Sequence, residues 1–243
     1  AKSIQQSILP KMENHKNVIN NFMSFYLPKD VVSGDFYMVE SFDEYTLIAL
    51  GDCTGHGVPG AFITLLGSNF LQRIAVENKC TSPSQILDLL DHQLFAYLNK
   101  NSESTVRDGM ELGLCLYNKK NKSLTFAGAG LFLVYYKDNE QYIIAGDKRS
   151  IGDENYVDVT FMETTIQLNG SEKFYLFSDG YRDQLGGLEK RKRFSRARFL
   201  ELLHKVKNLP PFQQEYLLKM EHLKYKGKLS QTDDISVIGF ELK

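Results

Sequence analysis

The sequence predicts an α+β domain in which antiparallel sheets are covered by helices on their outer sides. Three observations support this prediction. Short apolar segments bounded by polar turns recur along the chain, as in β-hairpins. Other segments have the apolar periodicity of amphipathic helices. No linker rich in proline or glycine divides the 243 residues, and a chain of this length can bury a large core as one domain.

The N-terminal segment has the pattern of a helix that ends at Pro10. Ile4 and Ile8 lie one turn apart, and proline cannot continue a helix. Because the chain starts at Ala1, in mid-pattern, we expect residues 1–10 to be the end of an upstream connector helix and residues 11–243 to form the domain. A frayed terminal helix explains the pattern equally well. The connector reading implies an upstream sensor or regulatory domain as a partner.

The first half of the domain combines strands with two helices. Strands are predicted over 22–26, 36–39 and 45–50. The first helix should run from about Pro59 to the Ala75 region, with one face formed by Phe62, Leu65, Leu66 and Asn69. The second should start at Pro83, because Ser82 is a good N-cap and Gln85 follows it by three residues. Its stripe is predicted to be core: Ile86, Leu90, Leu94 and Leu98.

The second half is richer in strands. Two hairpins are predicted, over 110–117 with 123–127 and over 131–136 with 141–144, because each pair flanks a polar turn. The remaining elements follow in order: strands over 157–168 and 173–177, helices over 196–207 and 212–223, and a strand over 235–242.

Composition excludes several classes of protein. The 29 Lys+Arg and 30 Asp+Glu give a net charge of -1, with 24% charged and 42% hydrophobic residues. These ordinary values exclude a disordered tail, a collagen-like fibre and a strongly basic nucleic-acid-binding protein. The three cysteines form no C-x-x-C pair, which argues against structural zinc and against a disulfide framework.

The expected location is the cytoplasm. No signal peptide is visible, and no apolar run approaches the roughly 20 residues needed to span a bilayer, so direct membrane insertion is not expected. A longer parent protein could still be tethered to a membrane. The oligomeric state stays open, with a homodimer among the alternatives.

Four aspartates stand at the ends of predicted strands. Asp35 precedes the second strand, Asp52 follows the third, and Asp179 and Asp233 lie beside the 173–177 and 235–242 strands. If such carboxylates gather, they repel one another unless cations neutralise them. Hard oxygen ligands select magnesium or manganese. Each Asp-Gly alone is a common turn, and spacing alone does not show that the four aspartates converge.

The motifs around these aspartates resemble those of a known family. They are Ile4-Gln5 with Leu9-Pro10, VSGDFY at 32–37, GDCTGHGVPGA at 51–61, DGM at 108–110, FAGAG at 126–130, FSDG at 177–180 and TDDIS at 232–236. Their order along all 243 residues resembles the PPM-type, metal-dependent serine/threonine protein phosphatases, in the bacterial branch of the stage II sporulation phosphatase.

The resemblance implies a four-layer αββα sandwich with a two-metal site at one edge of the sheets. Two divalent cations, manganese or magnesium, would be bridged by Asp52. The backbone carbonyl of Cys53 would bind one, Asp179 and Asp233 would hold the other, and Asp35 would act directly or through water. These four aspartates would be the catalytic residues. Asp234 is expected outside the ligand set.

The implied activity is hydrolysis of phosphoserine and phosphothreonine by a metal-activated water, without a phosphoenzyme. The resemblance makes an anti-anti-sigma-type phosphoprotein the expected substrate. Two other functions stay open. One is a catalytically weak domain of the same fold that binds a partner. The other is a hydrolase of small phosphate compounds.

Two further features have open interpretations. His56 is either a general acid for the leaving oxygen or a loop histidine that shapes the turn. A Cys53–His56 nucleophile is not expected, because no oxyanion motif or orienting residue accompanies the pair. The basic stretch Lys190–Arg198 is either a solvated loop and helix start or a docking site for an acidic or phosphorylated partner. Nucleic acid is not an expected partner, because interleaved aromatics and a wider basic field are missing.

Overall fold

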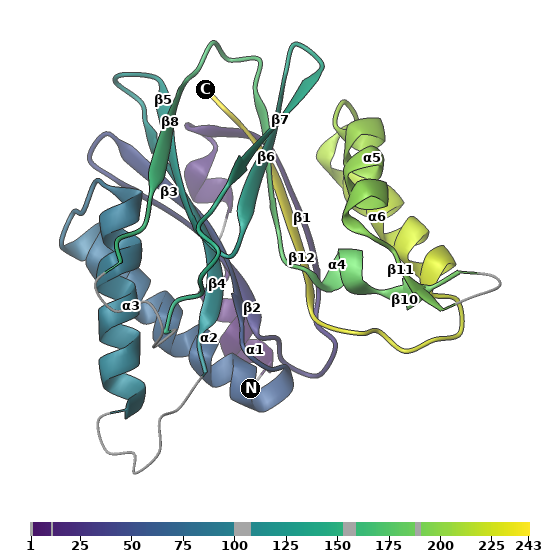
Figure 1. Ribbon diagram of the computed structural model, residues 1–243. Coiled ribbons are helices and arrows are strands. Elements are labelled where there is room, and N and C mark those ends of the chain that lie inside the picture. The colour runs from purple at the N-terminus through teal and green to yellow at the C-terminus, as the bar shows by residue number, and fades with distance from the viewer. Residues whose placement is uncertain (1, 11, 100–107, 153–158, 188–190) are drawn as a thin grey trace.

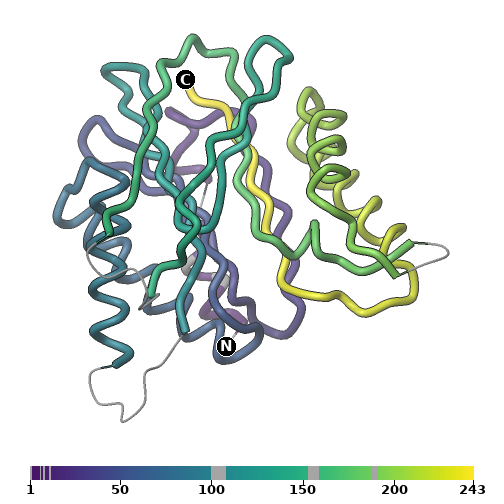
Figure 2. The backbone as a smooth tube through the Cα atoms, viewed as in Figure 1, coloured from purple at the N-terminus to yellow at the C-terminus, as the bar shows by residue number. Residues whose placement is uncertain are grey.

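A computed structural model describes residues 2–10, 12–99, 108–152, 159–187 and 191–243. Two five-stranded antiparallel sheets face each other, with the helices α2 and α3 outside one sheet and α5 and α6 outside the other (Figure 1). The backbone trace in Figure 2 follows the same layers. The predicted four-layer αββα sandwich is therefore confirmed.

The first sheet has the strand order β2-β3-β4-β5-β8. Its strands are β2 (Asp35–Phe42), β3 (Tyr45–Cys53), β4 (Met110–Asn118), β5 (Ser123–Ala129) and β8 (Glu163–Gln167). Neighbouring strands pair in one continuous antiparallel register from Asp35 opposite Asp52 to Ser123 opposite Gln167. The predicted hairpin of 110–117 with 123–127 is confirmed as β4–β5, and the predicted strands over 36–39 and 45–50 also pair as a hairpin. The second predicted hairpin, 131–136 with 141–144, is confirmed in the other sheet.

Helices α2 (Gly57–Gln72) and α3 (Pro83–Asn99) cover the outer face of this sheet, with the π-helical turn η2 (Arg73–Glu77) between them. The residues of α2 that are buried are mostly small, and Phe62 is 63% exposed. The predicted Phe62 stripe is therefore not the packing face, because glycines let this helix approach the sheet closely. The α3 stripe does pack into the core, and the Gln85 amide donates to Ser82 Oγ at 3.3 Å, as a cap requires.

The second sheet has the strand order β1-β12-β9-β6-β7. Its strands are β1 (Ile19–Leu27), β12 (Ile235–Leu242), β9 (Lys173–Phe177), β6 (Phe132–Lys137) and β7 (Glu140–Ala145). Helices α5 (Arg196–Val206) and α6 (Pro211–Lys226) lie outside it. Phe194 and Phe199 are buried there among aromatic side chains, as aromatic anchors of this layer.

Between the sheets, the inward side chains of both form one apolar core. Tyr37, Leu50 and Cys115 contribute from the first sheet, and Leu176 and Ile238 from the second. Because side chains alternate across a strand, Asp35 and Asp52 are on this same inward side. The carboxylates therefore lie at one end of the inter-sheet core.

Several short elements were not predicted. They are η1 (Met12–His15), α4 (Gly180–Asp183) and the hairpin of β10 (Leu185–Gly186) with β11 (Lys192–Arg193). Such elements are too short to carry a periodic pattern. The helix before Pro10 exists as α1 (Lys2–Ile8).

The predicted strand over 157–168 is wrong in length. Residues 159–162 lie outside β8, and the backbone amides of Phe161 and Met162 donate to Asp88 and Asp147 instead of to a strand. Residues 157 and 158 lie outside the described residues. Within the described ranges, no helix combines the length and apolar character needed to cross a membrane.

Candidate metal centre

Three carboxylates form a row across the first sheet. Asp35 on β2 is directly opposite Asp52 on β3, and Asp52 is directly opposite Glu111 on β4. Directly opposed residues of an antiparallel pair share one face with Cβ atoms about 4.5–5.5 Å apart. The row therefore points toward the second sheet, and like charges placed this way repel one another.

The second sheet contributes Asp179 and Asp233 from adjacent strand ends. Asp179 follows β9, Asp233 precedes β12, and these strands pair. A side chain on Gly180 would collide with the Asp234 carbonyl, so only glycine lets the two segments come this close. Their approach explains the glycine of the FSDG motif.

Ser178 joins the two sheets at this site. Its Oγ donates to Asp35 Oδ2 at 2.6 Å and accepts from the Ser236 amide at 3.0 Å. Asp35 is buried, and its backbone carbonyl accepts from the Tyr26 hydroxyl at 3.0 Å. One carboxylate oxygen of Asp35 is thereby fixed in place.

The electrostatics of the cluster favour a bound cation. Burial, opposed by the Ser178 hydrogen bond, raises the pKa of Asp35 to about 7. Burial and repulsion by Asp35 and Asp179 hold the pKa of Asp52 well above its usual range. Burial also raises the pKa of Asp179 and of Glu111. Since the site disfavours several carboxylate charges at once, and all its donors are hard oxygens, it fits divalent cations such as magnesium or manganese.

The carboxylates of the cluster do not form a complete metal coordination shell. Within the described part of the chain, no group of three or more His, Cys, Asp or Glu side chains is close enough to hold a metal ion as it stands. Asp35, Asp52, Asp179 and Asp233 act on one another electrostatically. The structure thus brings the four predicted aspartates to one region without completing a coordination shell.

The Cys53 side chain is not part of the cluster. Its thiol is buried on the helix side among core residues, with Thr64 Oγ1 3.5 Å from its sulfur. Burial raises the pKa of this thiol, so Cys53 is unsuited as a nucleophile. Only its backbone is available to the site, as the resemblance implies.

The loop after β3 is packed against glycines. A side chain on Gly34 would lie 2.6 Å from the Gly55 carbonyl, and one on Gly60 would also collide with that carbonyl. Thr54 fastens the loop to the start of β4, accepting from the Gly109 amide at 2.9 Å. Packing therefore requires glycine at position 60 of the 51–61 motif, because any side chain there would collide with the loop backbone.

His56 pairs with Asp30 at the surface. Its Nδ1 lies 2.6 Å from Asp30 Oδ2, and both side chains are about half exposed. This contact joins the loop after β3 to the loop after β1. From the sequence, His56 was either a general acid or a loop-shaping residue. The contact with Asp30 supports the loop-shaping interpretation.

Asp234 has a structural role. Its two carboxylate oxygens accept from the backbone amides of Lys29 and Gly34, each at 2.7 Å. Asp234 thus ties the Gly34–Asp35 turn to the start of β12. Its exclusion from the expected ligand set agrees with these contacts.

Sequence reasoning missed Glu111 and Ser178. Glu111 is one position after a motif that was recognised, but its place beside Asp52 depends on the β3–β4 register. Ser178 is visible in FSDG as a small polar residue, yet its bond to Asp35 requires the other sheet. Alternation within the strand 110–117, with register fixed by the hairpin turn, could have indicated Glu111.

Metal binding is expected to weaken as pH falls below about 7. The folded, metal-free protein holds the Asp35 proton up to a pKa of about 7, so a cation must displace that proton at lower pH. Manganese affinity should then drop by up to about tenfold per pH unit. Calorimetric titrations at pH 6, 7 and 8, in two buffers of different ionisation enthalpy, measure affinity and released protons. Asp35→Asn should lower the number of protons released on binding and make the profile less steep, whereas a pH-independent affinity of the natural chain would contradict the assignment.

This fold, with two antiparallel sheets flanked by helices, matches the PP2C-type phosphatase domains among solved structures. A family model described as Stage II sporulation protein E (SpoIIE) matches residues 43–243. The chain therefore belongs to the SpoIIE family of serine phosphatases. Comparison with curated protein sequences gives no match.

Solved structures of this class resemble the chain over nearly its whole length. The PP2C domain of SiaA from Pseudomonas aeruginosa is 28% identical, with a TM-score of 0.86 over 100% of this chain and 94% of that chain. SpoIIE of Bacillus subtilis, solved as its phosphatase domain with a fragment of its regulatory domain, is 17% identical, with a TM-score of 0.71 over 93% and 64%. RsbX in complex with magnesium is 14% identical, with a TM-score of 0.61 over 94% and 97%.

Proposed function

We propose that the chain hydrolyses phosphoserine and phosphothreonine on a bacterial signalling protein, using two manganese or magnesium ions. The observation that supports this most directly is the row Asp35–Asp52–Glu111 facing Asp179 and Asp233 across the sheets. A partner-binding domain without catalysis has no need of so many repelling, half-buried carboxylates, which cost stability.

In the proposed site, Asp52, Asp179, Asp233 and the Cys53 carbonyl would hold the ions, and Asp35 would bind directly or through water. Divalent cations bound there supply a water with a pKa near neutrality and neutralise charge on the phosphoryl oxygens. The protein's own part is positioning. Ser178 fixes Asp35 by its 2.6 Å hydrogen bond, and Asp234 holds the turn before it.

An upstream module is part of the proposal. The RsbU domain of Rv1364c from Mycobacterium tuberculosis has been solved together with an RsbW domain, and the SpoIIE phosphatase domain with a fragment of its regulatory domain. In this chain, the side-chain amide of Gln5 in α1 donates to the Ser33 carbonyl at 2.6 Å and accepts from the Ser33 amide at 2.9 Å. Ser33 Oγ in turn accepts from the Asp35 amide at 3.0 Å. Through Gln5, α1 thus contacts the segment that positions Asp35, which supports a connector role.

A metal titration with three substrates tests the proposed function. The chain stripped with chelator should be inactive, and manganese or magnesium should restore turnover of a phosphoserine protein or peptide. An anti-anti-sigma-type phosphoprotein should be preferred over nucleotides. Preference for nucleotides would favour a small-molecule hydrolase. Metal binding without turnover of any substrate would favour the partner-binding alternative.

A further inference from the structure

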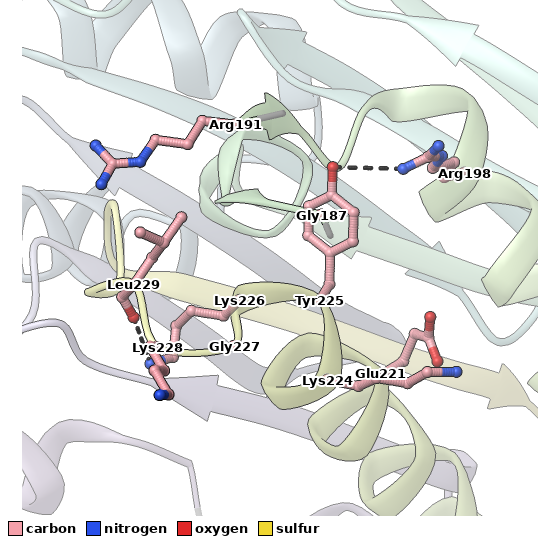
Figure 3. A pocket seen from close by; sticks show the side chains of 10 residues that line it. All are labelled: Gly187, Arg191, Arg198, Glu221, Lys224, Tyr225, Lys226, Gly227, Lys228 and Leu229. Carbon is pink, nitrogen blue, oxygen red and sulfur yellow. Dashed lines mark hydrogen bonds between the residues drawn. The ribbon is translucent and has the colours of Figure 1, made fainter. Parts of the chain in front are cut away.

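A basic groove lies beside the segments that carry Asp179 and Asp233. It has a volume of about 560 Å³, and among the described residues its charged lining consists of Arg191, Arg198, Lys224, Lys226 and Lys228 with one acid, Glu221. Figure 3 shows the Tyr225 ring in its centre, with Arg191 and Arg198 drawn on opposite sides of the ring. A groove with five cations and one carboxylate has a strong excess of positive charge.

Most of these cations are not used by the fold. Lys226 Nζ donates to the Leu229 carbonyl at 2.7 Å, and Arg198 lies 3.4 Å from the Tyr225 hydroxyl. Among the described residues, no carboxylate forms an ion pair with Arg191, Lys224 or Lys228. These three side chains are exposed. Arg193, by contrast, is paired with Asp183 at 3.1 Å and is not available.

The groove is built on the same backbone as the metal centre. Gly187 ends the segment that starts at Asp179 and donates its amide to the Tyr225 carbonyl at 3.1 Å. Leu229 lies four residues before Asp233 in the sequence. The two segments are joined by a hydrogen bond, because the Leu185 amide donates to Thr232 Oγ1 at 3.2 Å. A molecule bound in the groove would therefore rest on both segments that lead into the site.

We propose that this groove is a docking site for an acidic segment of the phosphoprotein substrate, outside the catalytic centre. The inference rests on the proposed phosphatase function. The groove is open and its free cations are spread along it, which suits several carboxylates of an extended segment better than one phosphate group. Docking there raises the local concentration of the phosphoserine at the catalytic centre and adds specificity, and it leaves the catalytic step unchanged.

Peptide kinetics test the proposal on the intact chain. The substrates are phosphoserine peptides with a run of glutamates before or after the phosphoserine, matched peptides with glutamines, and para-nitrophenyl phosphate. We expect the glutamate peptides to have a KM about tenfold lower than the glutamine peptides at low salt, with a similar kcat. Arg191→Glu with Lys228→Glu should remove this preference and leave para-nitrophenyl phosphate turnover unchanged. Equal loss with all substrates would overturn the docking role.

A binding measurement separates the groove from catalysis. A fluorescent glutamate peptide without phosphate should bind the chain, and the Arg191→Glu, Lys228→Glu variant should bind it about tenfold more weakly. The control is Lys119→Glu with Lys120→Glu, an exposed pair in the β4–β5 turn, which should change nothing. Equal affinity of all three proteins would overturn the proposal. If para-nitrophenyl phosphate is not hydrolysed at all, the proposed function fails, and peptide binding still decides the groove.

Discussion

Asp52→Asn is expected to lower kcat by about a thousandfold or more. The variant removes several kcal/mol of charge stabilisation from the transition state, and each loss of about 1.4 kcal/mol lowers the rate about tenfold. Asp52 stands between Asp35 and Glu111 in the strand register, so it is the carboxylate best placed to serve both halves of the site. Asparagine keeps its shape and removes its charge. Steady-state assays with a phosphoserine peptide and calorimetry with manganese would measure both losses.

The same variant should make the metal-free protein more stable. Burial and neighbouring carboxylates hold the pKa of Asp52 well above its usual range, so at neutral pH its ionised form is unfavourable in the folded state. Removing it should therefore raise the free energy of unfolding and the Tm of the metal-free protein. Asp43→Asn, in the exposed β2–β3 turn and paired with Lys79 at the surface, is the matched control. Wild-type turnover by Asp52→Asn would refute the metal assignment.

Arg149→Met is expected to lower the free energy of unfolding by about 3–5 kcal/mol, the usual cost of breaking a buried ion pair. The side chain of Arg149 is buried, faces Asp88 and Asp91 at 3.4 and 3.2 Å, and its guanidinium lies 3.6 Å from the Phe161 ring centre. Its removal would leave two carboxylates of α3 without their cation. Urea unfolding followed by circular dichroism measures the loss.

Arg73→Met provides the comparison for this prediction. Arg73 is exposed, contacts Gln93 and lies over Phe70, so its replacement should cost about 1 kcal/mol or less. Equal costs for the two variants would show that the Arg149 network contributes little. Adding Asp88→Asn to Arg149→Met should recover part of the stability, because one unpaired charge is removed.

The hydrophobic pattern predicted most of the helices and strands, and its failures have identifiable causes. The α2 face was misjudged because Phe62 and Leu65 are apolar yet exposed, while Gly60 and Gly67 form the packing side. Residues 159–162 look strand-like, but side chains of Asp88 and Asp147 bind their amides. These are tertiary contacts, which a local pattern does not contain.

The sequence indicated which aspartates belong to the candidate site, but it did not indicate how they are arranged in space. Asp35 and Asp52 are marked by strand-end motifs, and the structure places them opposite each other. Their approach to Asp179 and Asp233 depends on how the two sheets stack. The Ser178–Asp35 bond spans 143 positions of the chain, a separation at which no spacing rule applies. The role of Asp234 as a clamp on two amides could likewise only be seen in three dimensions.

The division of the carboxylates between two sheets has a consequence for quality control in the cell. Asp35 and Asp52 belong to one sheet and Asp179 and Asp233 to the other, so neither sheet alone carries a complete set. On the proposed function, a nascent chain, a proteolytic fragment or a partly unfolded molecule would therefore be catalytically silent. A damaged copy would then fail by losing its output instead of dephosphorylating at the wrong time, and measured activity would report only on fully assembled molecules.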